Sequence, residues 1–476
     1  MIQMNIMAFI KKIPTQHYPI LLVYLALFIY AFLRSYYLSF THDESLSFSI
    51  FNDVATISTT TANNHILNTF FMWISSFFLG NSEWALRLPN VLAFGVYLSA
   101  CYLLLIKDKS NWLLIIGSSL LLLNPFLIEF FALARGYGIS LGCMMVSLYF
   151  LLNNCFHYTS FHEFIKAYKR TLLFAFFAVL ANLSMINYFI AVILIYFIQY
   201  LVLYKAKYNQ FKISKSVLLF TLIPLIIGLG MLIFLSFKNQ LFIGEKTLHA
   251  TLNSMIESFI YFSDYPTWIF KSLKYSILVL FPIGLISVLF KKDFFGAFFL
   301  IILIIIIIII GLIIENLLFH ANFPAGRTSL LFFPLFGLFF YYFILHLITF
   351  YAPFKKIILI CSILISSLLI YHFSNNINLK TTKTWHYDSQ TKDVILTIES
   401  YAKKNKNPSA ISCLWIFEPT INYYISSRKL NIAKVSREGI DLSTDFIYTL
   451  EDNSNLAGYK PIKKYTEIGS CLFVKK

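Results

Sequence analysis

Two adjacent carboxylates, Asp43 and Glu44, stand directly after the first long apolar stretch of the sequence. A carboxylate in a partly dry site can act as a general base toward a hydroxyl group. Three arginines, Arg87, Arg135 and Arg327, each stand within or beside another apolar stretch. The planar guanidinium group binds phosphate oxygens through parallel hydrogen bonds. Together these residues predict a site that holds an anionic group, such as a phosphate, next to a proton acceptor.

The same residues also have ordinary structural interpretations. A polar stretch after a membrane helix commonly does no more than end that helix, and an arginine at the membrane surface commonly extends its charged group to water. Such an arginine can also pair with a nearby acid, for which Glu83 and Glu129 are candidates. A structure can distinguish the two interpretations, because a functional site requires the acids and the arginines to lie close together, whereas the structural roles do not.

The composition is that of a membrane protein with many spans. Of the 476 residues, 58% are hydrophobic and 13% are charged, whereas soluble domains average about half apolar and about a quarter charged. The net charge is +16, but most lysines fall in short loops on alternate sides of successive apolar stretches. This is the positive-inside pattern of a membrane protein, so the basic charge does not indicate a nucleic-acid partner.

About eleven apolar stretches are predicted to cross a membrane, since a crossing takes about 20 residues. The first stretch has no small-residue cleavage site, so we expect an uncleaved anchor with a cytoplasmic N-terminus. The acidic pair and the chain after Ser374 then lie on the extracytoplasmic side. The expected spans are 18–40, 84–106, 112–126, 137–152, two within 171–204, 217–237, one ending at 291, 294–314, 330–350 and 357–373.

Two of the apolar stretches are not simple spans. The stretch 171–204 is too long for one crossing, so we predict a hairpin that turns near Asn187 and Tyr188. The stretch Ile66–Gly80 is too short to cross comfortably, and its apolar and polar residues fall on opposite helical faces. This pattern predicts a helix that lies in the membrane interface, with a short tilted span as the alternative.

The composition changes sharply at Ser374, which predicts a transmembrane domain over 1–373 and a separate domain over 374–476. Short helical and strand-like stretches alternate after this point and predict a small α/β domain on the extracytoplasmic face. The fold class is thus mainly α, with predicted C-terminal helices at 388–404 and 418–427 and predicted strands at 411–417, 446–450 and 468–474.

No group of residues has the spacing of a metal or cofactor site. The six cysteines are scattered, without a zinc, haem or redox motif. Cys413 and Cys471 could form a disulfide if their region is extracytoplasmic, or remain buried thiols. We therefore expect no cofactor and no resident metal, although a requirement for a divalent metal stays open.

The segment Thr41–Ser45 resembles the first-loop acidic motif of the C-type (GT-C) membrane glycosyltransferases. Within that group it is most similar to the protein O-mannosyltransferase-like branch, which includes the bacterial lipid A aminoarabinose transferase. Three later segments, Phe78–Asn90, Ala134–Gly138 and Phe323–Thr328, resemble further landmarks of this branch in the same order. The resemblance covers most of the membrane part. Its first two motifs together are fairly specific, whereas the last two are weak alone.

The resemblance implies transfer of a sugar, hexosyl or pentosyl, from a polyprenyl-phosphate donor to a lipid, glycan or protein acceptor. The reaction would occur on the extracytoplasmic face of the plasma (inner) membrane of a bacterium, and we expect a monomer. By position, Asp43 would be the base for the acceptor hydroxyl and Glu44 would orient the acceptor or the base, with Glu44 as the base in the alternative assignment. Arg87, Arg135 and Arg327 would hold the donor phosphate.

Four further residues are candidates for substrate contact. His42 and His65 could bind the sugar or the phosphate, although interfacial histidines more often only satisfy local polarity. Tyr137 could contact the phosphate or the polyprenyl chain. Lys246 opens an amphipathic stretch that could close over a bound donor as a lid or form a fixed helix.

Two other functions compete with sugar transfer. A transporter or flippase for a lipid-linked anion would also bind phosphate, but the sequence shows no internal repeat of the transporter kind. A membrane scaffold whose polar tail binds partners is the second alternative.

Overall fold

The computed structural model describes residues 14–52, 61–108, 110–154, 158, 160–202, 215–241, 244–405, 410–450 and 456–476. The N-terminal segment predicted to be cytoplasmic lies almost wholly outside this part of the chain. The chain divides into two compact units. Unit 1 comprises 1–31, 91–131 and 137–377, and unit 2 comprises 32–90, 132–136 and 378–476. Unit 2 thus joins the C-terminal region to the acidic segment of the first loop.

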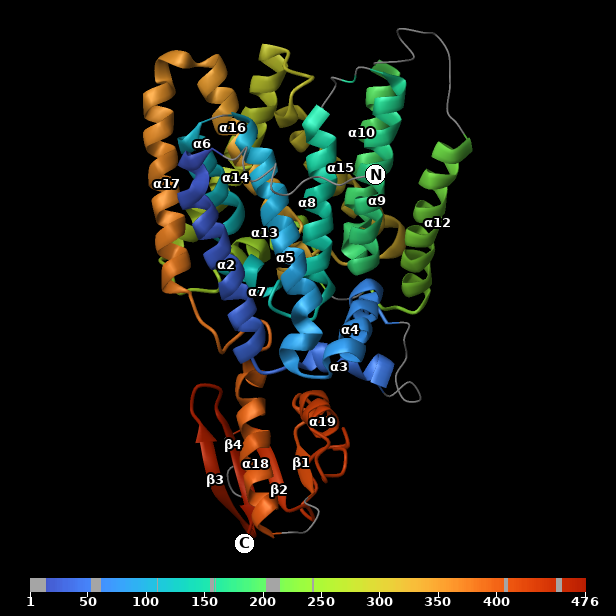
Figure 1. Cartoon of the computed structure of the whole chain (residues 1–476), viewed down its shortest axis with the longest axis vertical. Helices are drawn as coiled ribbons and strands as arrows, with labels where there is room; N and C mark the ends of the chain where they lie inside the picture. Colours follow the sequence, from blue (N-terminus) through green and yellow to red (C-terminus); the bar gives the residue numbers. More distant parts are fainter. Residues whose placement is uncertain are drawn as a thin grey trace. The chain divides into compact units, whose positions relative to one another are not determined.

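Unit 1 is built from long apolar helices (Figure 1). Nine helices in the described part of the chain are long and apolar enough to cross a membrane. They are α2 (Tyr18–Tyr37), α5 (Glu83–Leu105), α8 (Gly136–Asn154), α10 (Ile186–Tyr200), α12 (Lys215–Phe237), α14 (Thr267–Lys291), α15 (Ala297–Phe319), α16 (Phe332–Phe350) and α17 (Lys355–Asn375). The protein is a polytopic membrane protein, as its composition predicts.

The other two predicted spans are also helices, but they do not meet the same standard of length and hydropathy. One is α6 (Asn111–Leu122), which has only 12 residues and is followed by the short α7 (Pro125–Glu129). The other is α9 (Phe161–Ala181), whose first half carries several charged side chains. The described chain also contains α13 (Leu248–Phe259), a short amphipathic helix in unit 1.

The hairpin predicted over 171–204 is present, but its turn lies earlier than predicted. The chain turns at Leu183–Met185, where the side chain of Asn182 accepts a hydrogen bond from the backbone of Ser184. Asn187 is inside α10, and its amide donates to Glu315 of α15 at 2.9 Å. Because the Asn187 side chain has a hydrogen-bond partner on another helix, it can lie within a helix, and the turn predicted at this residue is not there.

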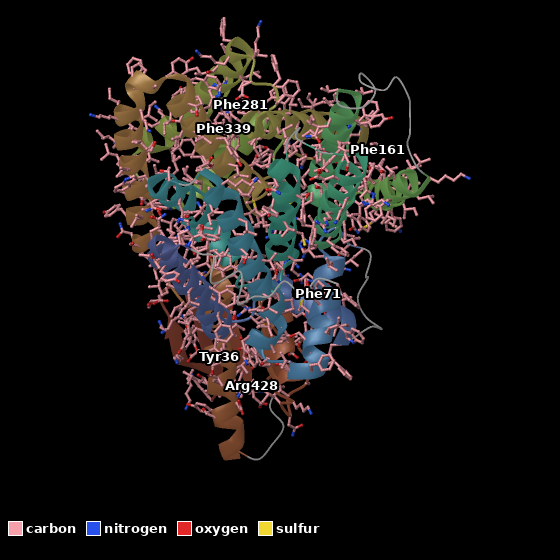
Figure 2. All side chains as sticks on the ribbon, turned by 45° about the horizontal axis from the view of Figure 1, so that its top comes forward. Tyr36, Phe71, Phe161, Phe281, Phe339 and Arg428 are labelled. Carbon is pink, nitrogen blue, oxygen red and sulfur yellow. The ribbon has the colours of Figure 1, made fainter. Side chains whose placement is uncertain are left out.

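Aromatic side chains fill the space between the helices of unit 1. Figure 2 labels Phe281 of α14 and Phe339 of α16, whose ring centroids are 5.2 Å apart. The helices α10 and α15 pack together, as do α16 and α6. Burial of these apolar faces gives unit 1 its own core.

Unit 2 contains two helices from the first loop and a small α/β domain from the C-terminal region (Figure 1). The loop helices are α3 (His42–Asn52) and α4 (Ile66–Leu79). The C-terminal helices are η7 (His386–Gln390), α18 (Thr391–Asn405) and α19 (Glu418–Ser427). The sheet has the order β1-β2-β4-β3, formed by β1 (Ile411–Cys413), β2 (Phe446–Leu450), β4 (Ser470–Lys475) and β3 (Tyr459–Tyr465).

In the sheet, β1 and β2 are parallel and the other two pairs are antiparallel. Two strands, β1 and β3, differ from the prediction. β1 is shorter than predicted, because the chain turns after Cys413. The edge strand β3 was not predicted, because its lysines and its proline are residues that disfavour a central strand but are tolerated at an edge. Cys413 and Cys471 lie on β1 and β4 with β2 between them, and they do not form a disulfide with each other.

The helix α4 is amphipathic, as predicted, and its polar face is the buried one. Asn68 and Ser75 are buried, whereas Phe70, Trp73 and Phe77 are about half exposed or more. An apolar face this exposed is typical of a helix that rests in a membrane interface.

Candidate functional site

The acidic segment forms the start of α3. The backbone N–H and the hydroxyl of Thr41 both donate to Oε2 of Glu44, each at 2.9 Å. This is one half of a capping box, in which an acid three residues into a helix satisfies an N–H that has no helical partner. Thr41 and Glu44 therefore fix where the helix begins, and Asp43 falls in its first turn.

Glu44 and Arg87 form a fully buried ion pair. Nε of Arg87 donates to Oε1 of Glu44 at 2.8 Å, and a second nitrogen donates to Oε2 at 2.7 Å. The remaining N–H groups of Arg87 donate to the backbone carbonyls of Ser35, Leu38 and Ser39 at 2.7–3.0 Å. A guanidinium group has five N–H donors, so every donor of Arg87 is used. These contacts favour a positioning role for Arg87 over the phosphate-binding role that its sequence position suggests.

Glu44 also connects α3 to the segment 132–136. Its Oε1 accepts a hydrogen bond from the backbone N–H of Ala134 at 2.5 Å. The carbonyl of Ala134 accepts from the amide of Asn68, which in turn accepts from the amide of Asn90 at 2.7 Å. All of these side chains are buried, and buried polar groups of this kind hold their backbone partners in one arrangement. The network fixes the residue that follows, Arg135.

Asp43 and Arg135 form the second ion pair of the site. One guanidinium nitrogen of Arg135 lies 3.5 Å from Oδ2 of Asp43. Another donates to the backbone carbonyl of Asp43 at 3.1 Å and to the hydroxyl of Ser47 at 2.9 Å. The side chain of Arg135 is fully buried, whereas that of Asp43 is 10% exposed. Of the two adjacent acids, Asp43 is thus the one that solvent can reach, and Glu44 is fully buried.

The remaining predicted residues are distributed over both units. In unit 2, His42 lies next to Asp43, and the backbone carbonyl of His65 accepts from Thr69 at the start of α4. Tyr137, Lys246 and Arg327 belong to unit 1.

In unit 1, Lys246 and Arg327 lie on segments that touch. Glu245 and Phe323 exchange two backbone hydrogen bonds of 2.8 Å, which places the exposed Lys246 near the segment that leads to Arg327. Gly326 donates to the hydroxyl of Ser254 of α13 at 2.9 Å. The structure thus brings two of the predicted basic residues into one region, while Tyr137 is buried at the start of α8.

Two residues of the C-terminal region contact the acidic segment and were not predicted. Asp388 accepts a hydrogen bond from the backbone N–H of His42 at 2.7 Å. The hydroxyl of Tyr424 accepts from the backbone N–H of Phe40 at 2.9 Å and contacts Glu83 at 3.1 Å. These contacts join residues more than 340 positions apart, so no local pattern signals them. The capping box, by contrast, is visible in the sequence Thr-x-x-Glu.

Within the described ranges no group of three or more histidine, cysteine, aspartate or glutamate side chains is arranged to hold a metal ion. The acids of the site instead have arginine and backbone N–H partners, which supply the positive charge locally.

The fold can be compared with known proteins. No family model matches the chain, and no curated protein matches its sequence. Two solved structures of ArnT from Cupriavidus metallidurans are similar over nearly the whole length. The apo state matches with a TM-score of 0.52 and 10% sequence identity, covering 95% of this chain and 97% of ArnT. The state bound to undecaprenyl phosphate matches with a TM-score of 0.54 and 9% identity, covering 97% of this chain and 98% of ArnT. The chain therefore has the fold of ArnT.

Proposed function

We propose that this protein is a membrane glycosyltransferase that takes a sugar from a polyprenyl-phosphate donor. The observation that carries the proposal is the Asp43 side chain, which is 10% exposed, beside the fully buried Arg135, within a fold shared with a protein solved in complex with undecaprenyl phosphate. A hydroxyl nucleophile needs a base and a phosphate leaving group needs positive charge. Asp43 offers the base, and Arg135 places positive charge beside it.

In the proposed reaction, the carboxylate of Asp43 takes the proton of the acceptor hydroxyl. The acceptor oxygen forms a bond to the anomeric carbon as the bond from that carbon to the phosphate oxygen breaks. The electron pair of the broken bond leaves with the polyprenyl phosphate. A single displacement of this kind inverts the configuration at the anomeric carbon. The acceptor side is the extracytoplasmic face, as the distribution of lysines predicts.

The proposed roles of the basic residues follow from their burial. Arg135 is held against Asp43 and Ser47, so it contributes fixed positive charge close to the base. Arg327 is half-buried and Lys246 is exposed, so these two can approach a ligand and are proposed to hold the donor phosphate. Tyr137 is proposed to contact the polyprenyl chain or the phosphate. The backbone N–H of His42 donates to Asp388. We propose that His42 lies beside the bound acceptor and does not act as an acid or a base.

The direct test uses the purified full-length protein in lipid nanodiscs. A panel of undecaprenyl-phosphate hexoses and pentoses is supplied with lipid A, a lipid-linked glycan or a serine-rich peptide as the acceptor. Release of undecaprenyl phosphate that depends on one sugar and one acceptor is the expected result, and the same assays with EDTA report whether a divalent metal is needed. Movement of the lipid-linked sugar across the bilayer without cleavage would instead identify a flippase and overturn the proposal.

We expect Arg327→Ala to weaken donor use while leaving the fold intact. Loss of one hydrogen bond to a charged group costs about 1.5–3 kcal/mol, which corresponds to a rise of about 10- to 100-fold in the KM for the donor. The matched control is Arg428→Ala, which removes an exposed arginine (labelled in Figure 2). This arginine pairs with Glu399. Equal donor KM values in the two variants would remove Arg327 from the phosphate site.

A further inference from the structure

Asp388 lies in η7, just before α18, in the C-terminal part of the chain. Its Oδ2 accepts a hydrogen bond of 2.7 Å from the backbone N–H of His42, the first residue of α3. Only 1% of Asp388 is exposed. The first N–H groups of a helix have no partner within the helix, and a carboxyl group placed there stabilises that end. Asp388 therefore caps the helix that carries Asp43, from a position 346 residues away in the sequence.

Other contacts from the same C-terminal part hold the residues on both sides of this cap. Nδ1 of His42 donates to the carbonyl of Ile416 at 2.8 Å, since a carbonyl can only accept. Before the helix, the hydroxyl of Tyr424 accepts the backbone N–H of Phe40. The segment from Phe40 to His42 is thus fixed at its backbone and at a side chain by the domain that forms the sheet.

We propose that Asp388 is a positioning residue of the transfer site, which caps α3 and thereby keeps the Asp43 carboxylate beside Arg135. This inference rests on the proposed function, in which Asp43 takes the acceptor proton. It gives the C-terminal domain a role in the reaction. Without Asp388, the backbone N–H of His42 in the first turn of α3 loses the one hydrogen-bond partner that it has among the described contacts. A shift of about 1 Å in a reacting group can lower a rate by about 100-fold.

The electrostatic surroundings of Asp388 add a pH dependence. Burial raises the pKa of Asp388 well above its usual value, and the negative charges of Glu44 and Asp43 raise it further, although the hydrogen bond from His42 lowers it. Tyr448 of β2 also interacts electrostatically with this carboxyl group. A carboxyl group whose pKa is raised by folding stabilises the folded state at low pH and loses that contribution as the pH rises through the raised pKa. Above that pH, a third negative charge would stand near Asp43.

The test compares Asp388→Ala with Asp388→Asn. Asparagine keeps an oxygen that accepts the His42 N–H but cannot ionise. We expect Asp388→Ala to lower kcat by about 100-fold with little change in the KM for the undecaprenyl-phosphate sugar. Asp388→Asn should recover most of the activity and remove the decline on the alkaline side that we expect of the wild type. Asp441→Asn is the matched control, because Asp441 is an exposed aspartate of the same domain, and among the described contacts its carboxylate accepts hydrogen bonds only from Ser443 in its own loop.

Hydrogen exchange provides a second measurement that does not depend on catalysis. Asp388→Ala should speed amide exchange in a peptide covering 41–48, whereas Asp388→Asn and Asp441→Asn should not. If the wild type transfers sugar but Asp388→Ala keeps wild-type kcat and wild-type exchange, the inference about Asp388 fails alone. If the wild type transfers no sugar with any donor, the proposed function fails, and the positioning role fails with it.

Discussion

Asp43→Asn is expected to lower the rate of sugar transfer strongly while the protein still folds and binds the donor. Asparagine has nearly the same shape as aspartate but cannot take a proton from the acceptor hydroxyl. Loss of a general base typically lowers a rate by about 100- to 10,000-fold. The measurement is kcat for release of undecaprenyl phosphate, with binding of undecaprenyl phosphate measured in parallel. We expect kcat to fall and the Kd for the lipid to stay within about threefold of the wild type.

The control for Asp43→Asn is Glu438→Gln, which removes one carboxylate from an exposed position in the same unit. It should leave kcat and lipid binding unchanged. Retained turnover in Asp43→Asn would show that another group accepts the proton, and would remove the main chemical argument for this site. A loss of folding in Asp43→Asn would contradict the assignment in another way, because it would mean that the ion pair with Arg135 is chiefly structural.

Much of the fold could be predicted from the sequence because hydropathy and charge report directly on the membrane. The interfacial helix α4 was predicted from two opposed faces, and the structure buries the polar one, including Asn68. In the C-terminal region, α19 and β2 have the predicted bounds. The missed strand β3 is at the edge of the sheet, where the sequence Tyr-Lys-Pro-Ile-Lys-Lys-Tyr has no apolar alternation to mark it.

The candidate site could be predicted only as a set of residues. Charge and position along the spans pointed to the acids and the arginines, but they could not say which acid meets which arginine. Those pairings depend on how distant segments pack, as the contact between Glu44 and Arg87 illustrates. The Thr-x-x-Glu pattern of Thr41 and Glu44 does mark the start of a helix. It gives Glu44 a structural role, which is easily overlooked because Glu44 is adjacent to Asp43.

Arg87→Ala is expected to destabilise the protein rather than to weaken donor binding selectively. The substitution leaves the carboxylate of Glu44 buried without its guanidinium partner, and it removes three hydrogen bonds to the carbonyls of the segment 35–39. Breaking a buried ion pair by removing one partner costs about 3–5 kcal/mol. The measurement is thermal unfolding of the detergent-solubilised protein, where Tm should fall clearly and the yield of folded protein should drop.

A double substitution distinguishes this structural role from phosphate binding. In Arg87→Met with Glu44→Gln, neither charge of this ion pair remains, so no unpaired charge is left buried there and we expect much of the lost stability to return. If Arg87 is a positioning residue, the folded double variant should bind undecaprenyl phosphate with nearly the wild-type Kd. If Arg87 instead holds the donor phosphate, Arg87→Ala should keep a wild-type Tm and lose lipid binding, and the double variant should not recover that binding. The first pattern follows from a guanidinium group whose five donors are already occupied by the protein, since a phosphate could bind there only by displacing Glu44 or a backbone carbonyl.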